Sequence, residues 1–284
     1  MTWFPQLKYV FGHFTVHQIS HNPKYILPIM NSTSVPGRRA RLGVIVPSSN
    51  TTLEPITQQM VLSLAQNGIE ASLHFARFRV TKIELSEDST SQFNLEPMLE
   101  AARLLADAKV DVIGWSGTSA SWLGFSTDET LCRMIKDTTG IPATSSVLVM
   151  RDYLAQSVTR DIGLVTPYVA EVNAAICDNF AREGFAIAET RSQCLGLTKN
   201  FDFAAVSEKE LDSMVAKVVE HGGRIILIMC TNLAAAQRAG FWEKEYSVVL
   251  LDSVATVLYG MLRQLNMNAS SLTAAWGSLF SDET

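Results

Sequence analysis

Short apolar runs alternate with amphipathic stretches from Arg41 to about residue 265. The apolar runs predict strands, and apolar residues spaced three or four positions apart predict helices. The predicted strands are 42–47, 70–79, 111–116, 142–145, 161–165, 185–193, 224–229 and 247–251. The predicted helices are 53–67, 95–108, 128–138, 146–156, 169–183, 207–221, 233–240 and 253–265. This alternation predicts an α/β fold with mainly parallel sheets flanked by helices.

The chain also shows signs of an internal repeat. The sequence LGVIVP at 42–47 is echoed by IGLVTP at 162–167, which places Gly43 and Gly163 120 residues apart. Two pseudo-symmetric domains would explain the echo, with residues 41–157 as the first half and 158–251 as the second. An active site would then lie in the interdomain cleft, where small-ligand pockets are common. The alternative is that any α/β protein yields such echoes.

Two apolar runs end in small polar residues and resemble two copies of one half-site. Val112–Ser116 is followed by Gly117, Thr118 and Ser119, and Ile225–Met229 is followed by Cys230. In open α/β sheets, ligands bind beyond the carboxyl ends of the strands. These residues are therefore the first candidates for a functional site.

Composition narrows the function classes. The 284 residues include 47% hydrophobic and 18% charged residues and carry a net charge of −5, with no Lys/Arg stripe for nucleic acid. No run of 18 apolar residues predicts a transmembrane helix. The four cysteines lack metal-type spacing and suit a reducing, cytoplasmic compartment. All five histidines lie away from the strand ends, so neither a metal site nor a Ser-His-Asp triad is supported.

Residues 1–40 differ from the rest, since the first acidic residue of the chain is Glu54. We expect a peripheral N-terminal extension. A basic targeting segment is one alternative, although the stretch is neither Arg-rich nor cleanly amphipathic. We favour two other interpretations over a targeting segment. The stretch is either a family-specific surface extension or the result of a start site upstream of a natural N-terminus near Met30.

Four segments resemble the aspartate/glutamate racemase superfamily, in its arylmalonate decarboxylase and maleate isomerase branch. The resemblance covers roughly residues 41–265. The segments are VPSSNTT at 46–52 with Glu54, GTSAS at 117–121 with Gly124, TPY at 166–168 with Asn173, and CTNL at 230–233. The resemblance implies a C-terminal part, 252–284, whose helix packs back on the first half.

One departure from the family pattern bears on the reaction. Racemases and maleate isomerases of this superfamily carry a cysteine in each half, whereas the first-half position here is Gly117. A two-base racemase needs a proton acceptor on one face of a carbon and a donor on the other, and glycine offers neither. The single-cysteine arrangement resembles that of the decarboxylases. It implies loss of CO2 from a malonate-type diacid, with Cys230 protonating the resulting enediolate.

A thiol suits this donor role because its ordinary pKa of about 8.5 leaves it mostly protonated at neutral pH. The alternative for Cys230 is a buried core cysteine, which is common. Core packing is the better interpretation for Cys132 and Cys177, which lie in helical patterns. Cys194, at a strand end, is a weaker candidate for the cleft.

Hydroxyl and backbone donors would bind the surviving carboxylate, since such groups stabilise an enediolate in a water-poor site. The resemblance implies that Thr118, Ser119, Tyr168 and Thr231 supply them, while Gly117 lets the ligand approach the backbone. Simple N-capping of the next helix is the alternative for Thr118 and Ser119, and a partly buried aromatic is the alternative for Tyr168.

A polar loop after the first strand leaves other reactions open. It contributes Pro47, Ser48 and Asn50, and the asparagine matching Asn50 binds a substrate carboxylate in maleate isomerases. Asn232 would also make the pocket polar. In arylmalonate decarboxylases, by contrast, the departing carboxylate lies in a hydrophobic pocket.

The sequence therefore predicts a cofactor-independent, metal-free lyase acting on a small carboxylate, with no nucleic-acid or membrane partner. A homo-oligomer is compatible with it. Two alternatives remain: a maleate isomerase-like or racemase-like enzyme, and a non-catalytic carboxylate-binding protein.

Overall fold

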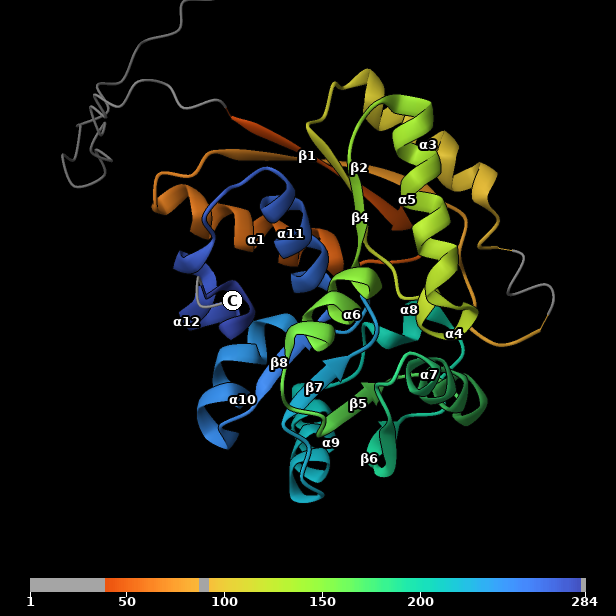
Figure 1. The fold of residues 1–284 in the computed structure, drawn as a ribbon, viewed down its shortest axis with the longest axis vertical. Helices are drawn as coiled ribbons and strands as arrows, with labels where there is room; N and C mark the ends of the chain where they lie inside the picture. The colour runs from red at the N-terminus through yellow and green to blue at the C-terminus, as the bar shows by residue number, and fades with distance from the viewer. Residues whose placement is uncertain (1–38, 87–91, 282–284) are drawn as a thin grey trace, which may run out of the picture. The chain divides into compact units, whose positions relative to one another are not determined.

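The computed structural model describes residues 39–86 and 92–281, which form two four-stranded parallel sheets flanked by helices (Figure 1). The strand order is β2-β1-β3-β4 in the first sheet and β6-β5-β7-β8 in the second. The same order recurs four strands later, which is the topology that a duplicated half predicts. The expected α/β fold with two pseudo-symmetric halves is confirmed. The predicted extension at 1–40 lies almost wholly outside the described residues.

The described residues of the first half form four strands and five helices. They are β1 (Ala40–Pro47), α1 (Leu53–Gln66), β2 (Ala71–Phe78), α3 (Leu95–Asp107), β3 (Val112–Trp115), α4 (Ala120–Leu123), α5 (Phe125–Thr139), β4 (Ala143–Ser145) and α6 (Ser146–Gln156). The inner strands β1 and β3 are mostly apolar because helices cover the sheet on its faces.

The second half repeats the pattern. Its elements are β5 (Ile162–Thr166), α7 (Ala170–Arg182), β6 (Ile187–Cys194), α8 (Asn200–Phe203), α9 (Glu208–Glu220), β7 (Ile225–Ile228), α10 (Ala239–Tyr246) and β8 (Val249–Asp252). The chain then continues into α11 (Ser253–Gln264) and α12 (Thr273–Trp276).

A glycine in the central strand of each half lets the flanking layer approach closely. Gly43 lies beside Ile113 in the first sheet, and Gly163 lies beside Ile226 in the second. A Cβ atom at Gly43 would lie 2.9 Å from a methyl of Val110, and one at Gly163 would lie 2.1 Å from a methyl of Val218. The sequence echo therefore has a packing reason in both halves.

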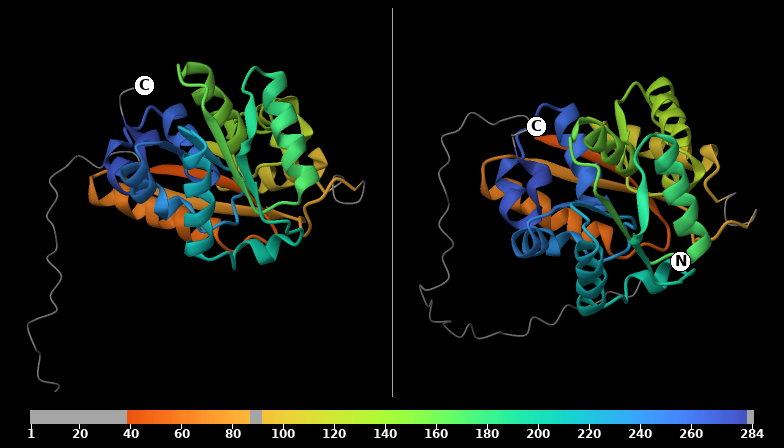
Figure 2. Two further views of the ribbon diagram at one scale, coloured as in Figure 1. Left: turned by 90° about the horizontal axis from the view of Figure 1, so that it is seen from below. Right: turned by 60° about the horizontal axis from the view of Figure 1, so that its bottom comes forward.

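The long apolar helix α11 follows the last strand of the second sheet but packs against β3, α6 and α1 of the first half. Figure 2 shows this blue helix beside the orange α1. A Cβ at Gly114 of β3 would lie 2.7 Å from both Val257 and Met261, so glycine permits this contact.

Most predicted elements lie within a few residues of those observed. The helix predicted at 233–240 is wrong over its first residues, because a short 3-10 turn at Ala236–Arg238 precedes α10, which extends to Tyr246. The one-turn helices α4 and α8 were not predicted. Both are too short for a 3.6-residue period to show.

We predict that Gly163→Ala destabilises the protein by about 1–3 kcal/mol, since the new methyl overlaps Val218 of α9. Val218→Ala, which removes the overlapping methyls, should make the double variant more stable than the sum of the two single losses by about 0.5–3 kcal/mol. Urea unfolding of the four proteins measures this coupling. Strictly additive losses would contradict the proposed contact.

Candidate active site

The carboxyl ends of the inner strands supply the side chains of the candidate site. The chain leaves β1 at Pro47, β3 at Trp115, β5 at Thr166 and β7 at Ile228. Beyond these ends lie Asn50, Gly117–Ser119, Tyr168 and Cys230–Asn232. Parallel strands bring their carboxyl ends to one edge of each sheet, which is why residues so distant in sequence can meet.

Hydrogen bonds join the predicted residues across the two halves. The hydroxyl groups of Thr118 and Tyr168 lie 2.8 Å apart. The amide of Asn50 donates to the Thr231 hydroxyl at 3.1 Å, and that hydroxyl donates to the Ser116 carbonyl at 3.4 Å. The site residues predicted from the two halves therefore do come together.

The junction is packed rather than open. Asn50, Thr118, Ser119, Tyr168, Cys230, Thr231 and Asn232 are each at most 5% exposed. Pro47 and Gly117 are also buried, whereas Ser48 is exposed. A ligand that enters this junction must exchange hydrogen bonds with the protein.

Cys230 is a buried thiol that accepts a hydrogen bond from the backbone N–H of Asn232 at 3.4 Å. Burial raises its pKa to about 12, the nearby Asp252 adds to the increase, and the Asn232 N–H and the Tyr168 hydroxyl oppose it. Desolvation disfavours the thiolate, so the sulfur carries its proton at neutral pH.

Aromatic rings enclose the Tyr168 side chain. Its ring centroid lies 5.4 Å from that of Trp122 and 5.5 Å from that of Phe203, both in edge-to-face contact. Phe93 extends the cluster, 5.9 Å from Trp122. Burial raises the Tyr168 pKa well above 10, so its hydroxyl stays neutral and can donate a hydrogen bond.

The ring of Trp115 fills the space beside Gly117. A Cβ atom at Gly117 would lie 2.0–2.5 Å from three atoms of that ring. No side chain fits at this position unless Trp115 moves. The first half thus lacks both the cysteine and the room for one.

Asn232 uses its side chain to fasten the two halves together. Its Oδ1 accepts from the backbone N–H groups of Thr51 and Thr52 at 3.0 and 3.2 Å, and its Nδ2 donates to the Asn200 carbonyl at 2.6 Å. In this arrangement the side-chain oxygen already has two donors, which limits what it can offer a ligand.

Asn50 is similarly occupied. Its Oδ1 accepts from the backbone N–H groups of Thr52 and Leu53, both at 3.0 Å, and so satisfies the first turn of α1. Its Nδ2 reaches Thr231, as described above. One amide hydrogen remains for a ligand.

The serines of the same loop already have hydrogen-bond partners within the protein. Ser48 bonds to both the N–H and the carbonyl of Val80, at 3.1 and 3.2 Å. Ser49 also donates to the Val80 carbonyl and accepts from the amide of Asn200 at 2.8 Å. Their hydroxyls therefore add less polarity to the junction than the sequence suggests.

Two buried carboxyl groups, those of Asp252 and Asp128, were not among the predicted site residues. Asp252 ends β8, and its Oδ1 accepts from the N–H groups of Val254 and Ala255 at 2.8 and 3.2 Å. Asp128 lies in α5, next to Ser145 and Trp115. Burial raises the pKa of each carboxyl to about 7. The strand-end rule that singled out Cys230 would also have singled out Asp252, whereas nothing local marks Asp128.

The other three cysteines lie elsewhere, in α5, α7 and at the end of β6. Among the described residues, no cluster of three or more His, Cys, Asp or Glu side chains could hold a metal ion. No helix in the described ranges is long and apolar enough to cross a membrane.

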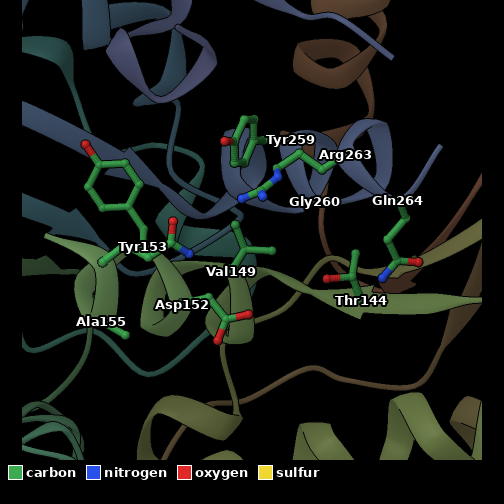
Figure 3. Close-up of a pocket in the computed structure, with 10 residues that line it drawn as sticks. Thr144, Val149, Asp152, Tyr153, Ala155, Tyr259, Gly260, Arg263 and Gln264 are labelled. Carbon is green, nitrogen blue, oxygen red and sulfur yellow. The ribbon is translucent and has the colours of Figure 1, made fainter. Parts of the chain in front are cut away.

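A separate hollow of about 410 Å³ lies between α6 and α11 (Figure 3), and none of the predicted site residues lines it.

Comparison with known proteins gives the family. A family model described as arylmalonate decarboxylase matches residues 42–280. The chain belongs to the arylmalonate decarboxylase family. This agrees with the superfamily resemblance in the sequence. The members of this family are enzymes, but family membership does not decide between decarboxylation and isomerisation.

Maleate isomerases and an arylmalonate decarboxylase are both similar to this chain. A maleate isomerase of Pseudomonas putida is 24% identical over 237 residues, covering 80% of this chain and 92% of the relative. The structure of maleate isomerase Iso from Pseudomonas putida S16 matches with a TM-score of 0.74 at 20% identity, over 86% of this chain and 99% of that one. Unliganded arylmalonate decarboxylase matches with a TM-score of 0.62 at 19% identity, over 87% and 100%. At these identities the structural matches show the shared fold alone.

We predict that Asn232→Ala destabilises the protein by about 1–3 kcal/mol, because it removes two hydrogen bonds to the first half and one to Asn200 within the second half. The exposed Asn67→Ala serves as the matched control. Chemical unfolding measures both variants. Equal stability of Asn232→Ala and the native protein would show that these bonds contribute nothing.

We predict that Asp252→Asn gains stability relative to the native protein as the pH rises. The folded pKa of about 7 exceeds the ordinary value of about 3.9, so the native fold prefers the protonated acid and loses stability between about pH 4 and 7. Asparagine keeps a capping oxygen but does not ionise.

The difference in unfolding free energy should therefore change by up to about 1.4 kcal/mol per pH unit across that range and level off above pH 7. The same substitution at exposed Asp137 is the control. Parallel pH profiles for Asp252→Asn and the native protein would contradict a raised pKa.

Proposed function

We propose that the protein is a cofactor-independent decarboxylase of a malonate-type diacid, with Cys230 as the proton donor. One observation carries the proposal: the thiol at the junction is buried, which raises its pKa and keeps it protonated, and the first-half strand end carries a glycine against which Trp115 packs. Such a site can deliver one proton to one face of a carbon. It has no second thiol for two-base racemisation or for nucleophilic attack from the first half.

The reaction begins with a diacid held by the carboxylate that it keeps. The hydroxyls of Thr118, Ser119 and Tyr168 and the backbone N–H of Thr231 are the donors, and Tyr168 exchanges its bond to Thr118 for one to the ligand. The carbon–carbon bond to the other carboxylate breaks, CO2 leaves, and the electron pair remains on the substrate as an enediolate. Preorganised donors in a buried site stabilise such a charge by about 3–4 kcal/mol each.

Cys230 then completes the reaction. Its S–H bond breaks as the proton passes to the substrate carbon, and the thiolate regains a proton from water. A thiol whose pKa is raised to about 12 reacts as an acid rather than as a nucleophile. The pKa increase that burial and Asp252 produce therefore keeps the proton on the sulfur until the enediolate, a stronger base, takes it.

The occupied hydrogen bonds of the first loop also support decarboxylation. Ser48, Ser49 and Asn50 direct most of their polar atoms at the protein itself. A departing carboxylate near this loop meets few free donors, and a poorly solvated carboxylate is destabilised relative to CO2.

Maleate isomerisation is the second candidate. Its support is the sequence similarity to a maleate isomerase along most of both chains. A related enzyme from Nocardia farcinica has been solved with a covalently bound succinylcysteine intermediate. In this chain such a route would require thiolate character at Cys230, which burial opposes. A carboxylate-binding protein without catalysis is a third reading of the same junction.

The deciding experiment is proton NMR in D2O with methylmalonate, phenylmalonate and maleate, using the native protein, Cys230→Ala and Cys177→Ala. We expect deuterated monoacid and CO2 from a malonate, a loss of at least about 100-fold in Cys230→Ala, and little change in Cys177→Ala. Thermal unfolding checks that both variants fold.

Other outcomes separate the alternatives. Full activity in Cys230→Ala would sink the assignment of the proton donor. Fumarate formed from maleate would favour the isomerase. Saturable binding of a diacid without turnover or deuterium exchange would favour the binding protein.

A further inference from the structure

Both backbone groups of Tyr168 are held by hydrogen bonds. Its N–H donates to the Thr166 hydroxyl at 3.3 Å, and its carbonyl accepts from the N–H of Gly196 at 2.9 Å. The first of these bonds closes a turn between a threonine side chain and the residue two positions later. Pro167 lies between the two, and its fixed φ leaves the turn little freedom. The direction in which the Tyr168 side chain leaves the end of β5 is therefore set in part by the Thr166 hydroxyl.

The Thr166 hydroxyl is itself oriented by Asn173, near the start of α7. The hydroxyl donates to Asn173 Oδ1 at 2.9 Å, and Asn173 Nδ2 donates to the Ser192 hydroxyl of β6 at 2.6 Å. Since a hydroxyl has one hydrogen, donation to Asn173 turns its lone pairs toward the Tyr168 N–H. The three bonds therefore form one chain that runs from β6 through α7 to Tyr168.

This chain of polar groups lies in apolar surroundings. Thr166 is 0% exposed and Asn173 is 8% exposed. The neighbouring residues of β5 and α7 are apolar and buried, namely Val165, Val172 and Ile176. Buried polar groups are costly unless they are paired, and a fully paired network makes its surroundings rigid. Compared with apolar packing, the chain adds a fixed orientation for the turn that ends in Tyr168.

Tyr168 is the residue of the candidate site for which such an orientation matters most. Its hydroxyl lies 2.8 Å from that of Thr118 and beside the Cys230 thiol. One side chain thus connects a proposed ligand-binding hydroxyl of the first half with the proposed proton donor of the second. A displacement of about 1 Å in a group of this kind can lower a reaction rate about 100-fold.

We propose that Thr166 and Asn173 are positioning residues, which hold Tyr168 between Thr118 and Cys230. Both act through the backbone of Tyr168 and not on the substrate. The kinetic consequence rests on the proposed decarboxylase function, whereas the effect on the position of Tyr168 does not.

The kinetic test compares Thr166→Val, which removes the hydroxyl, with Thr166→Ser, which keeps it. For a malonate that the native protein decarboxylates, we expect kcat/KM to fall about 10- to 100-fold in Thr166→Val and less than about threefold in Thr166→Ser. Equal losses in the two variants would show that the hydroxyl does not matter and would overturn the proposal.

The matched control is Thr139→Val, because Thr139 makes the same pair of bonds outside the candidate site. Its hydroxyl donates to the Ile135 carbonyl at 2.7 Å and accepts from the N–H two residues later, that of Ile141, at 3.1 Å. Thr139 ends α5, ahead of β4. We expect kcat/KM of Thr139→Val to stay at the native value. A loss as large as that of Thr166→Val would point to a general effect of the substitution and contradict a positioning role.

Asn173→Ala tests the second bond of the chain. It leaves the Thr166 hydroxyl without its acceptor, so we expect a loss of kcat/KM similar to that in Thr166→Val. Because both substitutions break one chain, the double variant should lose about as much as the worse single variant. Losses that multiply would show that the two residues act independently. Thermal unfolding checks that each variant folds, and Asn173→Ala decides alone if Thr166→Val does not.

A spectroscopic test does not depend on turnover. Tyrosine carrying an isotope label at Cζ is followed by NMR, and Tyr168→Phe assigns the Tyr168 signal. We expect this signal to shift or broaden in Thr166→Val and Asn173→Ala, and to keep its native position in Thr166→Ser and Thr139→Val. A native Tyr168 signal in both Thr166→Val and Asn173→Ala would refute the positioning role.

The two proposals can fail separately. A displaced Tyr168 signal in the variants together with inert malonates would support the positioning role and reject the decarboxylase. Malonate turnover by a protein whose Tyr168 signal neither variant changes would reject the positioning role alone.

Discussion

The fold depends on satisfying polar groups where the carboxyl ends of two sheets meet. Asn232 provides three of the hydrogen bonds, to Thr51, Thr52 and Asn200, and Asn50 connects to Thr231. The backbone adds further bonds nearby, since Ile83 N–H donates to the Thr198 carbonyl at 2.8 Å and Asn200 N–H donates to the Thr81 carbonyl at 3.2 Å. Unpaired groups at this depth would be costly, so the junction forms as a unit or not at all.

The same burial determines the chemistry. Removing water from Cys230 raises its pKa to about 12, and Asp252 reinforces the effect, so the sulfur keeps a proton that it can give to a stronger base. In the first half, Trp115 occupies the space beside Gly117, so no second thiol fits there. An enediolate formed here would be a stronger base than the thiolate, and it would meet one acid on one side. The proposed decarboxylation follows from these two constraints together.

Local sequence patterns predicted the strands and the residues just beyond them, because apolar runs and strand-end turns are short-range features. They predicted Gly117, Thr118 and Cys230 just beyond strand ends, and the family resemblance added Tyr168, whose hydroxyl lies 2.8 Å from that of Thr118. The patterns could not show that Trp115 packs on Gly117 or that Asp128 is buried beside Trp115, since both contacts depend on how helices cover the sheet. The helix predicted at 233–240 was wrong at its start because the 230–235 segment is committed to contacts between the halves. Asn50 and Asn232 show the same limit: their type suggested ligand binding, while their partners are largely within the protein.

The central claim is that one buried thiol protonates one face of the substrate carbon. The most direct test is the decarboxylation of methylphenylmalonate in D2O, followed by measurement of the enantiomeric composition and deuterium content of the 2-phenylpropionate formed. We predict a single enantiomer that carries one deuterium at the α-carbon, with formation abolished in Cys230→Ala. A racemic deuterated product from the native protein would contradict it, because protonation would then come from both faces or from free water.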